Sequence, residues 1–159
     1  MPKELEIKSI TAQDTIRLRH AVLWPNHPVS YVLLPEDDTG HHFGAFFTPN
    51  GAPELIGVIS LFNAPIPPAD LVDCSPDAEP IRAARFRKFA VEPGYQSQGV
   101  GTRLLEEVFS VASSELKFST IWCDARVVAA DWYRRRGMSP FGTSFFKGGL
   151  EYVRMRKDI

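Results

Sequence analysis

Two glycines one residue apart, Gly99 and Gly101, stand where an apolar segment ends and a helical pattern begins. Glycine in the first turn of a helix costs up to about 1 kcal/mol relative to alanine, so some gain is expected to offset it. The first four amide N–H groups of a helix have no partner within the helix, and the helix dipole is positive there. The turn could therefore bind a phosphate. It could equally be a tight connection between a strand and a helix without a ligand.

Two common phosphate-binding patterns do not fit this turn. The Walker pattern requires Gly-Lys followed by Ser or Thr, whereas Gly99 is followed by Val100 and Gly101. The dinucleotide pattern requires a third glycine three residues after the second, and this chain has Leu104 there. A phosphate ligand would have to be held in a different pattern.

Hydrophobic periodicity predicts the elements that position this turn. A strand is expected over 81–91 and a helix over 99–116, with its apolar residues on one face. A parallel strand pair is expected where this helix carries the chain to a short strand over 119–123. The other expected elements are a strand over 5–10, a helix capped by Thr11 and Asp14 and closed by Pro25, a hairpin over 41–48 and 54–62, a surface loop over 64–80, a helix over 126–136 and a closing hairpin between 141 and 156. This order predicts a mixed sheet with helices on its faces.

The composition is ordinary for a soluble globular protein. Of the 159 residues, 44% are hydrophobic and 23% are charged, with a net charge of −1, so we expect no nucleic-acid and no membrane partner. The spacing of Cys74 and Cys123 is typical of neither a disulfide framework nor a metal site, and no metal is expected. The first residues lack the apolar core of a signal peptide, so a cytoplasmic protein is expected.

The stretch QSQGVG, over residues 96–101, resembles a motif of the GNAT family of N-acetyltransferases. In that family the turn reads Gln/Arg-x-x-Gly-x-Gly/Ala. The preceding FAVEPGYQ resembles the family's strand and the acidic residue and proline that follow it.

A second stretch, over residues 126–138, resembles the family's helix Asn-x-x-Ala-x-x-x-Tyr followed by Gly-Phe. The spacing from Ala129 to Tyr133 is kept. Arg126 stands where Asn is usual, and Met138 stands where the aromatic residue is usual. The two stretches at the proper separation make the resemblance specific.

The resemblance implies a single N-acetyltransferase domain over residues 1–159. It also implies the GNAT fold, an α/β fold. In that fold a mixed, mostly antiparallel sheet of about seven strands has a splayed central parallel pair, and helices lie on both faces.

The resemblance further implies acetyl-CoA as the cosubstrate. In the family, backbone N–H groups of the turn hold the pyrophosphate, and the pantetheine arm lies along the strand before it. The coenzyme-binding residues implied here are Phe89, Ala90, Val91, Gln96, Ser97, Gln98, Gly99, Val100, Gly101, Thr102, Arg126, Ala129 and Tyr133.

The family's reaction is direct acyl transfer, in which a neutral amine attacks a thioester and a thiolate leaves. By its position, Tyr133 resembles the acid that protonates this thiolate. The alternative is that Tyr133 packs between helix and sheet with its hydroxyl satisfied.

The general base is where this chain departs from the family. Many relatives carry Glu at the position that corresponds to Arg85, and arginine cannot act as a base at neutral pH. A water chain could serve instead, or His41, His42 or Asp124. Each of these side chains could equally be a solvated or capping residue at a strand end.

The acceptor site is predicted from aromatic and charged side chains. Arg85 and Arg87 alternate along one strand and could clamp an acidic group of the acceptor, because arginine binds carboxylates bidentately. They could equally be solvated charges or pair with acidic residues of the loop over 70–79. The segment over 17–38 lies where the family builds its acceptor wall. The predicted substrate-binding residues are Trp24, Tyr31, His42, Arg85 and Arg87.

The resulting prediction is an N-acetyltransferase that moves an acetyl group from acetyl-CoA to a primary amine of a small molecule. Bulky residues in the segment over 17–38 favour a covered pocket over an open peptide groove. The alternatives are an N-acetyltransferase for proteins or peptides, and an acetyl-CoA-binding domain with weak catalysis. Both a monomer and a homodimer remain open.

Overall fold

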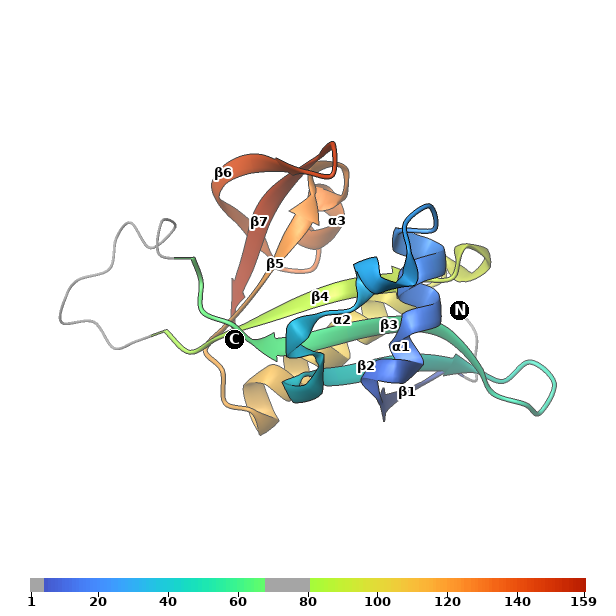
Figure 1. The fold of residues 1–159 in the computed structure, drawn as a ribbon. Helices are drawn as coiled ribbons and strands as arrows, with labels where there is room; N and C mark the ends of the chain where they lie inside the picture. Colours follow the sequence, from blue (N-terminus) through green and yellow to red (C-terminus); the bar gives the residue numbers. More distant parts are fainter. Residues whose placement is uncertain (1–4, 68–80) are drawn as a thin grey trace. The chain divides into compact units, whose positions relative to one another are not determined.

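The computed structural model describes residues 5–67 and 81–159, and its strands form one sheet in the order β1-β2-β3-β4-β5-β7-β6 (Figure 1). Most of the loop expected over 64–80, with Cys74, lies outside the described residues. The strands are β1 (Leu5–Ile10), β2 (His41–Phe47), β3 (Glu54–Asn63), β4 (Ala83–Val91), β5 (Thr120–Arg126), β6 (Ser139–Lys147) and β7 (Leu150–Asp158). The helices are α1 (Ala12–Leu18), α2 (Val100–Ser110) and α3 (Ala130–Arg134), with short 3₁₀ and π-helical turns between elements.

The sheet is mixed and mostly antiparallel, as predicted. Strand β1 pairs with β2, β2 with β3, β5 with β7 and β6 with β7, all antiparallel. The one parallel pairing described joins Ala83–Arg85 of β4 to Thr120–Trp122 of β5. The predicted mixed α/β sheet and its parallel pair are therefore confirmed, whereas the splay of that pair stays a prediction.

The contacts divide the chain into two compact units. The first unit comprises Met1–Phe62 and Phe86–Val111, and the second comprises Asn63–Arg85 and Ala112–Ile159. Strand β4 thus contributes its beginning to the second unit and its end to the first. The single domain over residues 1–159 stays a prediction.

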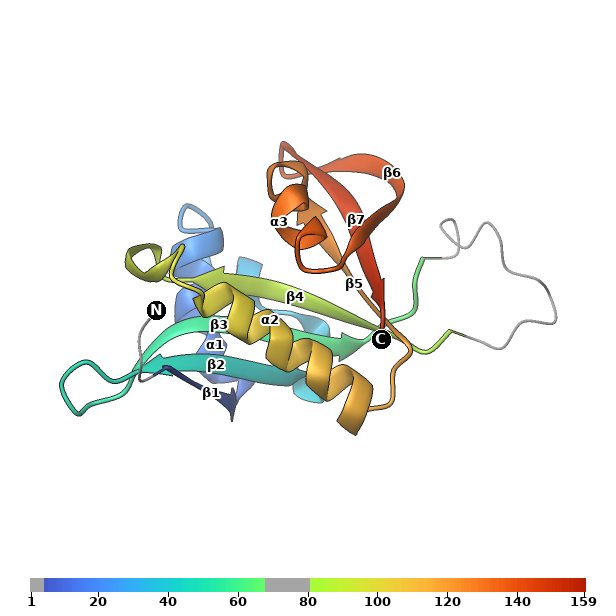
Figure 2. The ribbon, with the colours of Figure 1, turned by 180° about the vertical axis from the view of Figure 1, so that it is seen from behind.

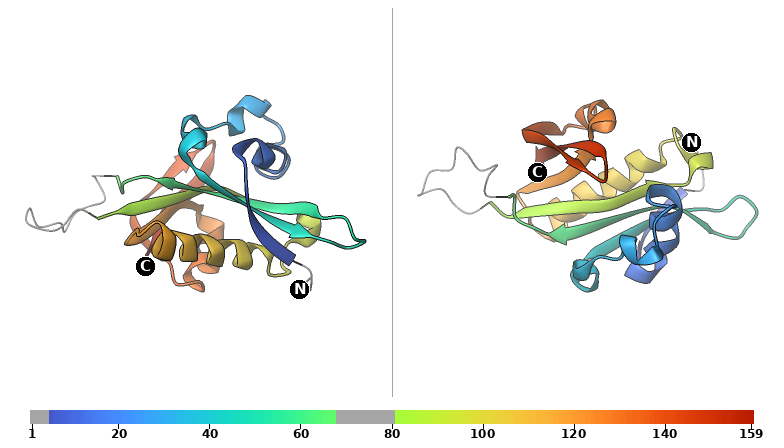
Figure 3. Two further views of the ribbon diagram at one scale, coloured as in Figure 1. Left: turned by 90° about the horizontal axis from the view of Figure 1, so that it is seen from below. Right: turned by 45° about the horizontal axis from the view of Figure 1, so that its top comes forward.

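In the first unit, α1 and α2 lie on opposite faces of the strands (Figures 2 and 3). On α2, the apolar row Val100, Leu104 and Val108 is buried. A Cβ at Gly57 of β3 would lie only 2.9 Å from Leu104 Cδ1. Glycine at this position lets α2 pack close against β3, which fixes where α2 begins relative to the sheet.

In the second unit, β5, β7 and β6 form an antiparallel sheet, and α3 contacts the β6–β7 hairpin. The register places Cys123 opposite Met155 and Asp124 opposite Arg154. Neighbouring residues of β5 point to opposite faces, so Cys123 and Asp124 lie on different sides of this sheet. Gly137 follows α3 with a φ of +92°, which ends the helical segment as the sequence predicts.

Local sequence signals account for most element ends. The capping box is present, since the Thr11 amide donates to Asp14 and the Asp14 amide donates to the Thr11 hydroxyl. The α-helix that follows is shorter than expected, because its last part, Arg19–Leu23, is a π-helical turn. None of the helices within residues 5–67 and 81–159 is long and apolar enough to cross a membrane.

Candidate functional site

The turn between β4 and α2 depends on left-handed backbone. Gly99 is the residue at the N-terminal cap of α2 and has a φ of +86°, a conformation that glycine adopts without strain. No side chain caps this end of the helix. The first helical bond of α2 runs from the Arg103 amide to the Gly99 carbonyl, 3.1 Å apart. The amide N–H groups of the first turn precede this bond in the chain. They therefore have no acceptor within the helix, and they lie at the positive end of the helix dipole.

Side chains of the turn stabilise the loop itself. Gln96 donates to the Val91 carbonyl at 2.9 Å, and Gln98 donates to the Gly94 carbonyl at 3.2 Å. Ser97, between them, has a φ of +62°, which is uncommon for serine. These two glutamine side chains bind backbone carbonyls and so stabilise the loop. The backbone N–H groups of the turn are the groups that could bind an anion.

The strand residues predicted to flank the coenzyme differ in burial. Ala90 is buried in the core with Leu18 and Val58. Phe89 and Val91 are half-buried. Lys88 has a φ of +55° and interrupts the regular alternation of β4 immediately before Phe89. The predicted contact of these residues with a coenzyme stays a prediction.

Tyr133 of α3 lies in the second unit with its hydroxyl enclosed by protein. Burial raises the pKa of this hydroxyl well above its ordinary value, and the neighbouring Cys123 thiol raises it further. The phenol is therefore protonated at neutral pH, as a proton donor has to be. Arg126 is exposed, and Ala129 is half-buried at the N-terminal cap of α3.

Asp124, one of the base candidates, is nearly buried among three cations of the second unit. Its side chain is 9% exposed, and Arg85 donates to its Oδ2 at 2.7 Å. Arg154 Nε lies 3.4 Å from Oδ1, and Lys147 Nζ lies 3.9 Å from Oδ2. The Arg85 guanidinium also lies over the Trp122 ring. Asp124 is thus the counter-ion of a cluster that includes Arg85.

Arg87 has a different carboxylate as its partner. It donates to Glu36 of the 3₁₀ helix Pro35–Thr39, within the first unit. Arg85 and Arg87, two residues apart on β4, therefore make separate ion pairs with carboxylates that are distant from them in sequence. The loop over 70–79, the other candidate partner, lies outside the described residues. Their predicted role as a clamp for an acidic acceptor stays a prediction.

A buried arginine lies at the centre of the first unit's polar contacts. Arg19 is 0% exposed and donates to both carboxylate oxygens of Asp37 at 2.9 Å. It also donates to the Val32 carbonyl at 3.1 Å and the Ser60 hydroxyl at 2.9 Å. Nothing in the sequence around Arg19 indicates its burial, because an arginine in an amphipathic helix is usually solvated. Its partners come from three other segments, so no local pattern reveals them.

His42 belongs to the same network and is 6% exposed. Its Nε2 lies 2.9 Å from the Asp37 backbone oxygen, which can only accept, so Nε2 donates. Its Nδ1 lies 2.7 Å from the Ser60 hydroxyl, which accepts from Arg19 and is left to donate to Nδ1. Both ring nitrogens are thus engaged within the protein. Any contribution of His42 to a substrate site is therefore expected to be indirect, whereas its neighbour His41 is exposed.

The predicted aromatic wall contains three rings in contact. The Trp24 and Tyr31 ring centroids lie 5.1 Å apart, and His27 stacks on Tyr31 at 4.2 Å. Tyr31 is 42% exposed, and the flanking Val29 and Leu33 are exposed as well. The segment therefore presents aromatic and apolar surface, as an acceptor wall would.

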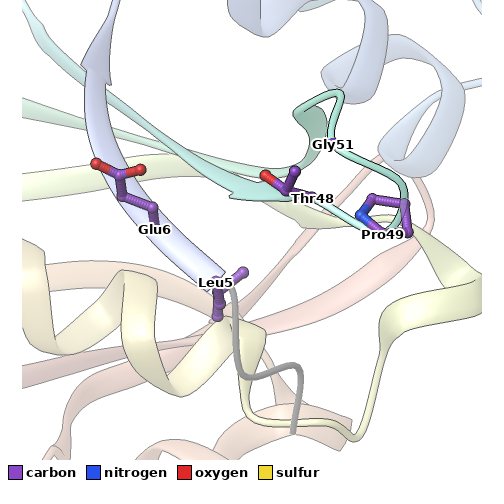
Figure 4. A pocket seen from close by; sticks show the side chains of 5 residues that line it. All are labelled: Leu5, Glu6, Thr48, Pro49 and Gly51. Carbon is purple, nitrogen blue, oxygen red and sulfur yellow. The ribbon is translucent and has the colours of Figure 1, made fainter.

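Among the described residues, a hollow lies beside the start of β1 and the connection between β2 and β3. It is lined by Leu5, Glu6, Thr48, Pro49 and Gly51 (Figure 4). None of the predicted site residues lines it. Within the described part of the chain, no group of His, Cys, Asp and Glu side chains could hold a metal ion.

Comparison with known proteins identifies the class to which this fold and turn belong. Residues 78–159 match the family model of the acetyltransferase (GNAT) domain, which is more than half of the chain. The chain belongs to the GNAT family, and the protein is an acetyl-CoA-dependent acyltransferase.

Individual relatives agree with this assignment. The chain is 28% identical over 153 residues to the uncharacterized N-acetyltransferase YitI of Bacillus subtilis, covering 92% of this chain and 90% of YitI. FeeM, an N-acyl amino acid synthase from uncultured soil microbes, shares the fold with a TM-score of 0.71 and 14% identity, covering 97% of this chain and 90% of FeeM. A spermidine N-acetyltransferase chimera, from Vibrio cholerae SpeG and hSSAT, has a TM-score of 0.65 and 16% identity, covering 98% of this chain and 96% of the chimera.

The buried ion pair of Arg19 and Asp37 makes the stability of the fold depend on pH in the acid range. Burial alone would raise the pKa of Asp37, but hydrogen bonds from Arg19 and the Leu34 amide, with the charges of Arg19 and His42, lower it below its ordinary value. This carboxylate therefore contributes stability above the ordinary Asp pKa of about 3.9, and the contribution is lost as pH falls through the lower folded-state pKa.

We expect Asp37→Asn to lower the free energy of unfolding by about 3 kcal/mol at neutral pH, because Arg19 stays buried without its counter-charge. The variant should also lose less stability than the wild type as the pH falls below about 4. Denaturant unfolding across this pH range measures both effects. Asp38→Asn, at the exposed neighbouring position, is the control. Equal pH dependence in the wild type and Asp37→Asn would contradict the assignment.

Proposed function

We propose that this enzyme transfers the acetyl group of acetyl-CoA to a primary amine of a small molecule. The observation that carries the proposal is the turn from β4 into α2. There a glycine with left-handed backbone starts a helix whose N-terminus has no side-chain cap. Such an end offers several N–H donors and a positive dipole to the same anion, which suits a diphosphate.

The residues around the turn fit this group. Gln96 and Gln98 hold the loop through backbone carbonyls, so the backbone of the turn is fixed before a ligand arrives. Gly101 in the first turn leaves room for close approach to the helix backbone. The amides of Val100, Gly101 and Thr102 would hold the diphosphate, and Phe89, Ala90 and Val91 would flank the arm of the coenzyme.

When bound, acetyl-CoA supplies a thioester whose carbonyl carbon the amine nitrogen attacks. The chain's own residues have to orient the amine and manage two protons. Tyr133 is proposed to give its phenol proton to the leaving sulfur and to recover a proton from the amine nitrogen. A phenol is protonated at neutral pH even at its ordinary pKa of about 10, and burial raises the pKa of Tyr133 further, so the proton is present but is held more tightly.

A small-molecule acceptor is favoured by the rigidity of the segment over 17–38. The buried contacts of Arg19 attach this segment at Val32 and Asp37, and the Trp24, His27 and Tyr31 rings pack on one another. A fixed wall of large side chains suits a small ligand better than an open groove for a peptide. The fold itself does not discriminate, since it is shared by an N-acyl amino acid synthase and a spermidine N-acetyltransferase.

Release of free thiol from acetyl-CoA in the presence of amine panels tests the proposed function. We expect turnover with a small primary amine and a preference for amino acids over polyamines, because Arg85 and its cationic neighbours attract an acidic group. Polyamines as the best substrates would contradict the acidic preference. Activity only on peptides would favour a protein acetyltransferase, and binding of acetyl-CoA without turnover on any amine would favour a binding domain.

Gly101→Val is expected to weaken acetyl-CoA binding at least tenfold, a loss of about 1.4 kcal/mol, because the side chain would occupy space that the diphosphate needs. Calorimetric titration measures the affinity. Gly94→Val is the matched control, since a Cβ at Gly94 would meet no atom within 4 Å. Unchanged affinity in folded Gly101→Val protein would remove the phosphate-binding interpretation of the turn.

Tyr133→Phe is expected to lower kcat by ~10²-fold, the usual scale for loss of a general acid, with little change in acetyl-CoA affinity. Steady-state thiol release and calorimetry measure the two effects. Near-normal turnover on a good acceptor would return Tyr133 to a packing role.

A further inference from the structure

We propose that Glu36 accepts the proton that the acceptor ammonium has to lose before it can attack. This inference rests on the proposed acetyl transfer. An amine in water is mostly protonated at neutral pH, and only the neutral form is a nucleophile. Where many relatives have a glutamate on β4, this chain has Arg85, and Glu36 is a carboxylate that reaches β4 from another element.

The contacts within the first unit bring Glu36 to β4. Its carboxylate accepts from Arg87, two residues before Phe89, which is proposed to flank the coenzyme. The Glu36 side chain is 36% exposed, whereas the side chain of Asp124 is only 9% exposed. A base has to release its proton to water after each turnover, and Glu36 can do so. Glu92, which directly follows β4, is equally exposed and is paired with Arg17, so the contact with Arg87 within β4 is what distinguishes Glu36.

The backbone next to Glu36 is fixed by the buried network. The 3₁₀ helix Pro35–Thr39 is too short to be stable alone. Asp37 fastens it, because its carboxylate accepts from Arg19 and from the Leu34 amide and its backbone oxygen accepts from His42. Replacing a buried ion pair by apolar residues is often neutral or stabilising, so the use of this pair lies in fixing geometry. The network therefore sets the position of the adjacent Glu36.

The ion pair with Arg87 prepares the carboxylate for its task. The guanidinium restricts the rotamers of the Glu36 side chain and holds its carboxylate against β4. Glu36 in turn neutralises Arg87, so that this part of β4 does not repel an ammonium group. The charged or titratable groups described around Glu36 are Arg87 on β4, Arg19 at the end of α1, His42 on β2, and Asp37 and Asp38 on its own helix.

With Glu36 as the base, every proton of the acetyl transfer is accounted for. An ammonium acceptor loses two protons when it becomes an amide. Glu36 takes the first and later releases it to water, and the freed amine forms the C–N bond. The C–S bond breaks, and the second proton goes to the thiolate, which leaves as the free thiol of coenzyme A.

Glu36→Gln tests the proposal, with Glu54→Gln as the matched control at an exposed position. We expect kcat/KM of Glu36→Gln to fall ~10²-fold at neutral pH. The loss of kcat/KM relative to the wild type should become smaller as the pH rises towards the pKa of the acceptor amine, because more of the amine then binds in its neutral form. It should also be smaller for an acceptor with an α-amino group, whose pKa is about 8, than for a lysine-like amine with a pKa of about 10.4. Glu36→Asp should retain a neutral-pH activity above that of Glu36→Gln.

A loss of equal size at every pH and for both amines would overturn the proposal and leave Glu36 a structural residue. Activity equal to that of Glu54→Gln would overturn it as well. Calorimetric titration with acetyl-CoA and thermal unfolding of each variant report coenzyme binding and folding separately. If the wild type transfers acetyl groups and Glu36→Gln does so equally well, only the role of Glu36 fails. If the wild type transfers none to any amine, the proposed function fails.

Discussion

Where a helix begins after a strand and a short loop, its first amides have no partners inside the helix, and the backbone conformation of the residue before it decides the direction in which the helix starts. In this protein that residue is Gly99, with a φ of +86°. The absence of a Cβ at Gly57 lets α2 pack close to β3. The end of β4, the turn and the start of α2 are therefore held in one rigid arrangement within the first unit. The proposed coenzyme site is a consequence of this geometry, because the first amides of a helix have no acceptor within the helix, and a diphosphate can accept from them.

The second constraint is the buried pair of Arg19 and Asp37. A fully buried guanidinium requires acceptors for its charge. Here the Val32 carbonyl, both Asp37 oxygens and the Ser60 hydroxyl accept from the two terminal nitrogens of Arg19, whereas its buried Nε has no hydrogen-bond partner among the described residues. These contacts join the end of α1, the 3₁₀ helix Pro35–Thr39 and β3. The segment proposed as the acceptor wall is thus attached to the sheet by polar contacts, which demand more exact geometry than apolar packing does. This arrangement also sets the position of Glu36, because Glu36 directly precedes Asp37, which is bound to Arg19.

Local patterns predicted the fold well because they report on neighbouring residues. The Thr11–Asp14 capping box, the antiparallel hairpin of β2 and β3, and the parallel crossover from β4 to β5 each follow from periodicity or turn chemistry. The polar contacts were not predictable in this way. Arg87 and Glu36 are 51 residues apart, and Arg19 and Ser60 are 41 apart. The alternation of Arg85 and Arg87 was visible in the sequence, but their partners on separate elements were not. For Arg19, the helical pattern contains no sign of burial, and its partners come from tertiary contacts.

The central claim is that the N-terminus of α2 binds the diphosphate of the coenzyme. A crystal structure of the protein with coenzyme A bound tests it most directly. The account predicts diphosphate oxygens within hydrogen-bond distance, about 2.7–3.2 Å, of the amide nitrogens of Val100, Gly101 and Thr102. A diphosphate held elsewhere, with these amides facing water, would contradict it.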